Sequence, residues 1–335
     1  MTETGKLDGP VFVVGMNGSG TTMLLDSLGR HPELYAFPRE TRLIPHLIID
    51  TQRFGNLRDD ENFRALWDAA RNLPAFVFVY GSHPPPLPQD WRQCPRSAAA
   101  VLDRIFLYFA AREGKRRWCE KTPQHVQHIG SLADAFPQAS FIHVIRDGRD
   151  CAASFKRRWG RTPELSVYRW KKVVAEGLRQ GALIGTERYM EVRYEDITGE
   201  PEHWLRRLCE FLRVPFDSAV LESSQPYLET AGRSISGGGL KPNTGNWQRT
   251  FSASKVAKLE RIGGAMLQRL GYELQTDGGD YDPHPLRRWQ WTNGDMVRQY
   301  LREIVLKLRG RIERPWHMIL IKPWVSRTQR RSNRY

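Results

Sequence analysis

Short apolar runs alternate with amphipathic stretches along the first two thirds of the chain. The run at 141–145 is continuous apart from His143, as in a strand that is buried on both faces of a parallel sheet. The apolar runs predict strands at 11–14, 34–37, 141–145 and 189–193. Helical periodicity predicts helices at 21–30, 97–112, 126–136, 149–158, 164–185 and 201–213. The alternation predicts an α/β fold, a P-loop-like parallel β-sheet flanked by helices on both faces.

The first predicted strand leads into a loop rich in glycine and hydroxyl groups. Residues Gly15 to Thr22 have the frame of a phosphate-binding loop, G-x-x-x-x-G-[KT]-[ST], and open the next helix. Glycines allow successive N–H groups to point at an anion, and a helix N-terminus favours the same anion. Thr21 stands where a nucleotide triphosphatase has lysine. The loop therefore favours a 5′-phosphate without a triphosphate tail; the alternative is an ordinary glycine-rich turn.

The strand at 141–145 leads into a second polar loop. Arg146 follows the strand directly, and Ser154 lies eight residues further on, in the next helix. A guanidinium and a hydroxyl can bind one phosphate together. The alternative is a surface salt-bridge cluster of Arg146, Asp147, Arg149 and Asp150. With the first loop present, the pattern favours a protein that grips two separate phosphates of one nucleotide.

The ordered set of motifs resembles the sulfotransferases that use 3′-phosphoadenosine 5′-phosphosulfate (PAPS), from about Val11 to about Leu270. Two of the motifs, which begin at Glu40 and Glu120, resemble in particular the protein-tyrosine sulfotransferases and their bacterial relatives. The resemblance rests on the following segments: Ser19–Thr22, Glu40–Pro45, Glu120–Pro123, Arg146–Arg149 with Ser154, Arg193–Asp196 and Gly245–Trp247.

The resemblance implies a donor site at the two loops. Arg146 and Ser154 would hold the 3′-phosphate, with Lys241 as a second cation, and Tyr194 would lie near the adenine. No metal is expected to take part. The 5′-phosphosulfate would be held by the first loop, that is by Asn17, Gly18, Ser19, Gly20, Thr21 and Thr22.

The resemblance also implies the chemistry, in which a sulfuryl group passes from PAPS to a hydroxyl or amine by in-line displacement. Glu40 matches the general base that takes the acceptor proton, and Lys121 would neutralise charge on the sulfuryl oxygens and the leaving phosphate. Both residues also have a simpler reading as solvated surface charges. Many relatives carry Arg or Lys where this chain has Gly18. Lys121, Arg42 or Arg39 is expected to supply the missing cation, and Arg42 is a candidate substrate contact.

The resemblance suggests one nucleotide-binding domain at 8–275. Within it, 38–96 is expected to form a helical cap over the acceptor site, 83–88 a surface loop and 236–239 a flap over the nucleotide. The acceptor is not readable from the sequence and could be a glycan, a glycolipid, a small molecule or a peptide.

The segment 281–335 lies outside the resemblance and is strongly basic. It holds thirteen Lys or Arg against four Asp or Glu, which accounts for most of the net charge of +14. Apolar residues between Met296 and Leu308 mark one face of a helix. A basic amphipathic helix of this kind can lie on an anionic membrane. The alternative, slightly favoured by the sequence, is a helix docked on the catalytic core with a solvated basic outer face.

Composition sets the remaining expectations. The chain has 335 residues, of which 40% are hydrophobic and 26% charged, as in globular proteins. Its four cysteines form no C-x-x-C pair, and no apolar run approaches the roughly 20 residues of a membrane span. The N-terminus lacks the apolar core of a signal peptide. We therefore expect a cytoplasmic, bacterial enzyme, with no nucleic acid as partner because no recognised nucleic-acid motif is present.

Two other functions fit parts of the sequence. A P-loop kinase or NTPase would use the first loop, but Thr21 disfavours it. A non-catalytic module that binds nucleotides or anionic surfaces would explain the basic charge and the glycine at position 18.

Overall fold

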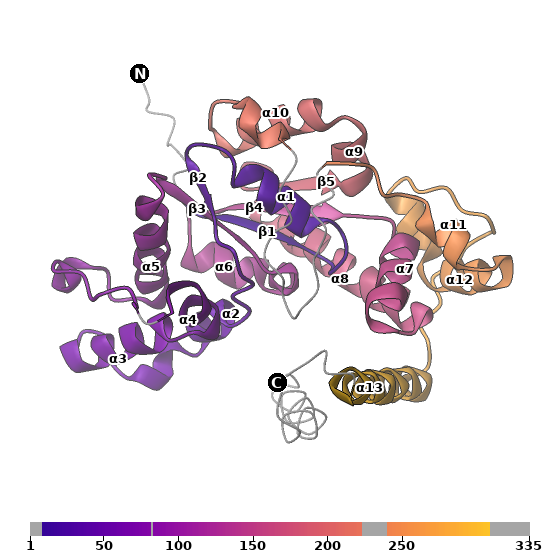
Figure 1. The fold of residues 1–335 in the computed structure, drawn as a ribbon, viewed down its shortest axis with the longest axis horizontal. Coiled ribbons are helices and arrows are strands. Elements are labelled where there is room, and N and C mark those ends of the chain that lie inside the picture. Colours follow the sequence, from indigo (N-terminus) through magenta and orange to yellow (C-terminus); the bar gives the residue numbers. More distant parts are fainter. Residues whose placement is uncertain (1–8, 82, 223–239, 309–335) are drawn as a thin grey trace. The chain divides into compact units, whose positions relative to one another are not determined.

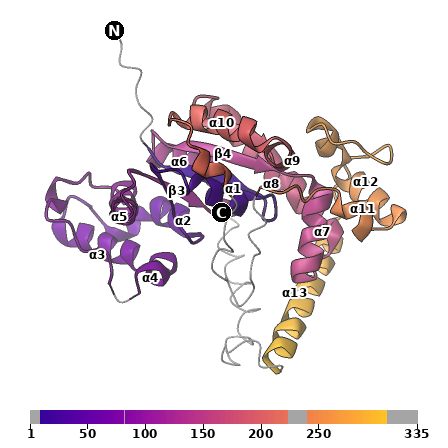
Figure 2. The same cartoon turned by 45° about the horizontal axis from the view of Figure 1, so that its top comes forward.

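The computed structural model describes residues 9–81, 83–222 and 240–308 (Figures 1 and 2). The predicted flap at 236–239 and the basic residues beyond 308 lie outside this part. The described chain divides into two compact units. The first unit holds 9–146, 172–222 and 240–244, and the second holds 147–171 and 245–308.

The first unit is built on a five-stranded parallel sheet with the strand order β2-β3-β1-β4-β5 (Figure 1). The predicted α/β class and parallel sheet are confirmed. All four predicted strands form, and a fifth strand lies between two of them. The strands are β1 (Val11–Gly15), β2 (Leu34–Ala36), β3 (Arg117–Lys121), β4 (Ser140–Ile145) and β5 (Tyr189–Arg193).

The strand that the sequence did not predict is β3. It carries Arg117, Glu120 and Lys121, so it has no apolar run, yet all of its residues are buried. Local partners make this burial possible. The Arg117 guanidinium, for example, donates to the backbone oxygens of Gly9 and Leu212 and to the Ser140 hydroxyl. Buried polar groups are tolerated when each finds a hydrogen-bond partner.

Side chains alternate along the strands and build an apolar core on each face of the sheet. Phe12 and Phe141 point into one core, which is completed by helices α2 to α6. Val13 and Ile142 point into the other, which is completed by α1, α9 and α10. The helices of the first unit are α1 (Thr21–Leu28), α2 (Ile44–Ile49), α3 (Asp60–Arg71), α4 (Pro74–Tyr80), α5 (Ala98–Arg112), α6 (Ile129–Ala135), α9 (Tyr194–Gly199) and α10 (Pro201–Leu212).

Four short 3₁₀ turns complete the first unit, at Thr51–Phe54, Trp91–Gln93, Pro123–His128 and Ser218–Leu221. The expected helix at 126–136 is therefore a 3₁₀ turn followed by α6. The region 38–96 is helical as expected, and residues 83–88 form a loop without regular structure. That 38–96 covers an acceptor stays a prediction.

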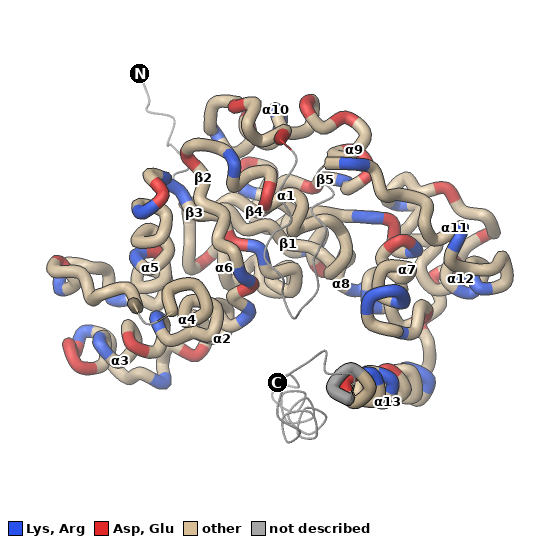
Figure 3. Tube along the Cα trace, viewed as in Figure 1, with Lys and Arg blue, Asp and Glu red and all other residues tan. Residues whose placement is uncertain are grey.

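The second unit is helical. Its helices are α7 (Gly148–Trp159), α11 (Asn246–Thr250), α12 (Ala253–Arg269) and α13 (Pro285–Leu308), and α8 (Pro163–Ile184) contributes residues to both units. Asp147 caps the N-terminus of α7 by accepting from the Arg149 N–H. Lys and Arg residues recur along α7 and α13 (Figure 3).

Candidate functional site

The loop between β1 and α1 has the backbone geometry of an anion cradle. Gly15, Gly18 and Gly20 have φ angles of 152°, 87° and 102°, which side-chain-bearing residues rarely adopt. The Ser19 N–H donates to the oxygen of Met16 at 3.0 Å and closes the turn. Since α1 begins at Thr21, the first N–H groups of this helix have no acceptor inside it. They are the groups that a phosphate at the helix N-terminus would use.

Two further observations fit a bound anion at this loop. The Ser19 hydroxyl is buried and has no hydrogen-bond partner in the described part of the chain. Buried hydroxyls normally have one, so this oxygen is suited to a ligand. In addition, the loop is tightly packed: a Cβ on Gly20 would lie 2.4 Å from Cδ2 of Tyr194. The Tyr194 ring thus fixes the last residue before the helix.

Arg146 lies against the same loop. One guanidinium nitrogen donates to the oxygen of Gly18 at 3.1 Å, and another donates to the oxygen of Asn243. The guanidinium also lies over the Tyr194 ring, 4.3 Å from its centroid. The Tyr194 hydroxyl in turn donates to the oxygen of Lys241 at 3.5 Å. The structure therefore brings together Arg146, Tyr194, the loop and the Lys241 segment, which were predicted from distant parts of the sequence.

Ser154 lies on α7, in the second unit, and is buried. That Arg146 and Ser154 bind one phosphate stays a prediction.

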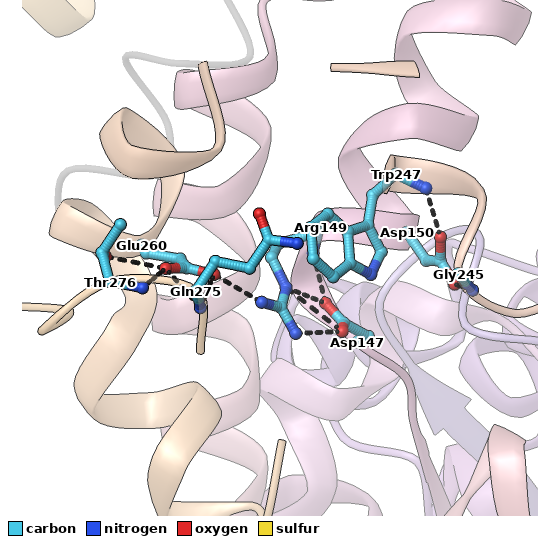
Figure 4. A network of polar contacts seen from close by, with 8 residues as sticks. All are labelled: Asp147, Arg149, Asp150, Gly245, Trp247, Glu260, Gln275 and Thr276. Carbon is cyan, nitrogen blue, oxygen red and sulfur yellow. Dashed lines mark hydrogen bonds and ion pairs between the residues drawn. The ribbon is translucent and has the colours of Figure 1, made fainter. Parts of the chain in front are cut away.

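The alternative of a surface salt-bridge cluster after β4 is wrong, because Arg146, Asp147, Arg149 and Asp150 are all buried. The Arg149 guanidinium is paired with two carboxylates (Figure 4). It donates to both oxygens of Asp147 and, at 2.5 Å, to Oε1 of Glu260. Burial would lower the pKa of Arg149, but hydrogen bonds and charges from Asp147 and Glu260 raise it. We therefore assign Arg149 a structural role.

The same network holds the Gly245–Trp247 segment, also shown in Figure 4. Asp150 accepts from the Gly245 N–H at 2.9 Å and from the Trp247 N–H at 3.0 Å. The indole ring of Trp247 packs against the Arg149 guanidinium, 4.0 Å from centroid to Cζ. Trp247 therefore contributes to packing within the second unit.

Glu40 and Lys121, which are 81 positions apart in the sequence, form an ion pair. The Lys121 ammonium donates to Oε1 of Glu40 at 3.0 Å, and Arg42 donates to Oε2 at 3.0 and 2.7 Å. The Glu40 side chain is only 22% exposed. Burial would raise the pKa of Glu40, but Lys121 and Arg42 outweigh it and lower the pKa. Glu40 is therefore an anion at neutral pH, the form that a base requires.

The position of this pair follows from the sheet. Lys121 ends β3 and lies opposite Val13 of β1, two residues before the glycine loop begins. Because both strands are parallel, their carboxyl ends meet at one edge, where ligands bind in such sheets. The Glu40–Lys121 pair and the glycine loop therefore lie at the same edge of the sheet.

The cations that could replace the one missing at position 18 differ in their surroundings. The Arg39 guanidinium lies over the Phe78 ring, 3.2 Å from its centroid. Arg42 is held by Glu40, and its side chain is 67% exposed. Lys121 is nearly buried at the end of the strand beside the loop. Its place makes Lys121 the best candidate for the missing charge.

The model of the sulfotransferase family matches residues 10–218, more than half of the chain. The chain belongs to the sulfotransferase family. This sulfotransferase is 24% identical over 298 residues to protein-tyrosine sulfotransferase A of Caenorhabditis elegans, covering 81% of this chain and 69% of the relative. It is also 24% identical over 332 residues to an omega-hydroxy-beta-dihydromenaquinone-9 sulfotransferase of Mycobacterium tuberculosis, covering 86% and 80%.

A solved structure supports the fold of this sulfotransferase. The sulfotransferase domain from the curacin biosynthetic pathway superposes with a TM-score of 0.53 at 23% identity, covering 81% of this chain and all of that one. In the part of the chain that the structure describes, no helix is long and apolar enough to cross a membrane. The four cysteines are free and buried.

The sequence did not predict a role for Glu120, which precedes Lys121 in β3. Its carboxylate is fully buried, and Oε1 accepts from the Thr41 N–H at 3.1 Å, the Thr41 hydroxyl at 2.8 Å and the Thr122 hydroxyl at 2.5 Å. Its Oε2 lies 3.1 Å from Nδ1 of His125. Glu120 thus fastens the segment that carries Glu40 to the strand that carries Lys121. The signal for Glu120 lies in the motif that begins with it, one position before Lys121.

Asp26 is a second unpredicted residue. It lies on α1, one helical turn after Thr22. Burial raises the pKa of Asp26 to about 6, against the opposing charges of Lys121 and Arg30. This carboxyl therefore changes charge near neutral pH within reach of the field of Lys121.

Proposed function

We propose that this sulfotransferase moves the sulfuryl group of PAPS to a hydroxyl acceptor, with Glu40 as the general base. One observation carries the proposal: a partly buried carboxylate held by Lys121 and Arg42 lies at the sheet edge where the phosphate loop begins. A base beside an anion cradle suits the deprotonation of an acceptor close to a phosphosulfate.

The donor would be held at its two ends. The helix N-terminus at Thr21 and Thr22 and the unpartnered Ser19 hydroxyl suit the 5′-phosphosulfate. Arg146 suits the 3′-phosphate, since it lies over Tyr194 and donates to backbone oxygens that a phosphate can replace as acceptors. Ser154 and Lys241 would add contacts to the same phosphate.

The reaction would be an in-line displacement at sulfur. The acceptor oxygen forms a bond to sulfur while the bond from sulfur to the 5′-phosphate oxygen breaks, which releases 3′,5′-ADP. Glu40 accepts the proton of the acceptor hydroxyl. Lys121 neutralises charge that develops on the sulfuryl oxygens and on the leaving phosphate. Its nearly buried position strengthens that interaction, because screening by water is weak there.

The acceptor class follows from chemistry common to the relatives. The names of the two curated relatives specify protein tyrosine and an omega-hydroxy dihydromenaquinone, both of which carry hydroxyl groups. Glu40, which is ionised at neutral pH, would accept the hydroxyl proton as the bond to sulfur forms.

The test measures release of 3′,5′-ADP from PAPS in the presence of a tyrosine peptide, a hydroxylated isoprenoid and a simple phenol. Glu40→Gln should bind 3′,5′-ADP as the wild type does and lose turnover by at least about 100-fold, the usual scale for a general base. Glu202→Gln is the matched control, because Glu202 also pairs with an arginine, at 2.7 Å, but on the surface of α10. A Glu40→Gln variant as active as Glu202→Gln would remove Glu40 as the base.

A further inference from the structure

Helix α13 has one side that is tied to the rest of the second unit. Asp295 is buried and accepts from the N–H and the hydroxyl of Thr162, at 2.9 and 2.8 Å. The Arg298 guanidinium donates to Gly160 and to Thr162, and Arg302 donates to the oxygen of Arg158. These arginines thus bind the turn between α7 and α8. That α13 docks on the catalytic core with a solvated basic face stays a prediction; Arg298 contacts this turn although its side chain is 51% exposed.

The opposite side of α13 is apolar and exposed. Large apolar residues recur there at helical spacing: three lie on the side away from Asp295, and Trp289 and Val305 flank them. Five of them have between 44% and 63% of their surface exposed: Leu286, Trp289, Val297, Leu301 and Val305. A helix in contact only with water would carry polar residues at these positions. We call these five residues the outer face.

A hollow of about 300 Å³ adjoins one end of the outer face. It lies between α8 and α13, and Trp289 belongs both to it and to the outer face. Arg169 and Arg288 line it together with Tyr168, whose hydroxyl accepts from Arg288. Two guanidinium groups beside two aromatic rings are suited to an anionic group at an interface between water and hydrocarbon.

More positive charge lies where α13 meets α7. The last turn of α7 exposes Lys156, Arg157 and Arg158, followed by the partly exposed Trp159. The contact between Arg302 and the oxygen of Arg158 places this turn beside α13. The apolar outer face is thus accompanied by cations at both of its ends.

We propose that the outer face, the hollow and the last turn of α7 together dock on the surface of an anionic lipid bilayer. The apolar side chains enter the boundary between headgroups and acyl chains, where tryptophan is favoured. The arginines and lysines bind anionic headgroups, each contributing about 1 kcal/mol near such a surface. Docking of this kind does not depend on which acceptor the enzyme uses.

Charge decides against the other possible occupants of the outer face. A second copy would bring the same cations together, and like charges within the same contact are unfavourable. The chain after residue 308 adds eight Lys or Arg and one acidic residue, which an anionic surface would also attract. An anionic lipid surface complements all of these charges and also takes up the apolar side chains.

The test is co-sedimentation of the full chain with vesicles of phosphatidylcholine, with and without phosphatidylglycerol, at low and high salt. The wild type should bind only the anionic vesicles and should be released by salt. The double variant Trp289→Asp/Leu301→Asp should bind them at least about tenfold more weakly, since two large side chains no longer enter the interface. Lys156→Glu/Arg157→Glu should lose affinity and part of the salt dependence.

The matched control is Leu183→Asp, because Leu183 is 75% exposed but lies at the end of α8 in the first unit. It should bind vesicles as the wild type does, and thermal unfolding checks that each variant folds. Absence of wild-type binding at low salt, or unchanged binding by the Trp289/Leu301 variant, would overturn the proposal. So would competition by soluble glycerol 3-phosphate, which indicates a free-anion site, or a dimer that this variant dissociates.

Discussion

Replacing Glu120 with glutamine tests how the proposed base is held in place. Glutamine keeps an acceptor oxygen but loses the charge of a carboxylate that is fully buried. Burial would raise the pKa of Glu120, but His125 and the hydroxyls of Thr122 and Thr41 lower it, so the residue is an anion in the fold. The three hydrogen bonds to Oε1 therefore become bonds to a neutral acceptor.

The size of the effect can be worked out from these bonds. A hydrogen bond to a charged group contributes about 1 kcal/mol more than one to a neutral group, so the three bonds together should cost about 3 kcal/mol of unfolding free energy. With an unfolding entropy of about 2.1 cal/mol/K per residue, the melting temperature of this 335-residue chain should fall by roughly 4 °C. Release of Thr41 should also displace the neighbouring Glu40. A shift of about 1 Å in a catalytic group can cost on the order of 100-fold in rate, so kcat should fall by about 10- to 100-fold.

The assay compares kcat for sulfuryl transfer with the dissociation constant of 3′,5′-ADP. Glu120→Gln should lower kcat and leave this dissociation constant within about twofold, because the two phosphate loops do not contact Glu120. Asp103→Asn is the control, since Asp103 accepts from the Trp118 indole at 2.7 Å and has no contact with Glu40. It should keep the wild-type kcat. Equal values of kcat for the two variants, or a parallel loss of 3′,5′-ADP binding in Glu120→Gln, would refute this reasoning.

Three further outcomes follow from named contacts. Gly20→Ala should weaken 3′,5′-ADP binding by roughly tenfold or more in a calorimetric titration, because its Cβ would overlap the Tyr194 ring. The control Gly81→Ala, whose Cβ has nothing within 4 Å, should bind 3′,5′-ADP as the wild type does. Asp26→Asn should bind 3′,5′-ADP about as tightly as the wild type near pH 5 and a few fold more tightly above pH 7, since the wild-type carboxyl ionises at about 6 and then repels the anion; equal pH profiles would contradict this. Burial lowers the pKa of His143 from 6.5 to about 3, so between these pH values the unfolded chain binds a proton that the folded chain does not. As the pH is lowered from about 6.5 to 3, the unfolding free energy should therefore fall by at most about 1.4 kcal/mol per pH unit. Denaturant titrations of His143→Gln should lack this slope.

The sequence predicts those strands of the sheet whose buried residues are mainly apolar. Three of the four predicted strands are apolar runs, interrupted only by His143, and can be recognised without knowledge of their neighbours; β5 also contains Glu191 and Arg193. The strand β3 was not predictable in this way, since its charged residues are buried against groups that come from elsewhere in the chain. Such partners become visible only when the tertiary structure is known.

The sequence likewise predicts some residues of the candidate site and not others. Short motifs in the sequence predict the glycine loop, Arg146, Glu40 and Lys121. The structure places Glu40 next to Lys121 and Arg146 next to the loop. The role of Glu120 depends on contacts across 79 positions of sequence, and no spacing rule predicts them. The orientation of α13 was also hidden, because periodicity identifies the two faces of a helix but not which of them is covered.

The central claim, a nucleotide held by both its 5′- and 3′-phosphates, is tested most directly by calorimetric titration with 3′,5′-ADP and with 5′-AMP. The account predicts that 3′,5′-ADP binds at least about tenfold more tightly, because a charge-assisted contact contributes about 1.5–3 kcal/mol. Arg146→Ala should abolish most of that preference. Equal affinities of the wild type for the two nucleotides would contradict the assignment of Arg146 and the proposed use of PAPS.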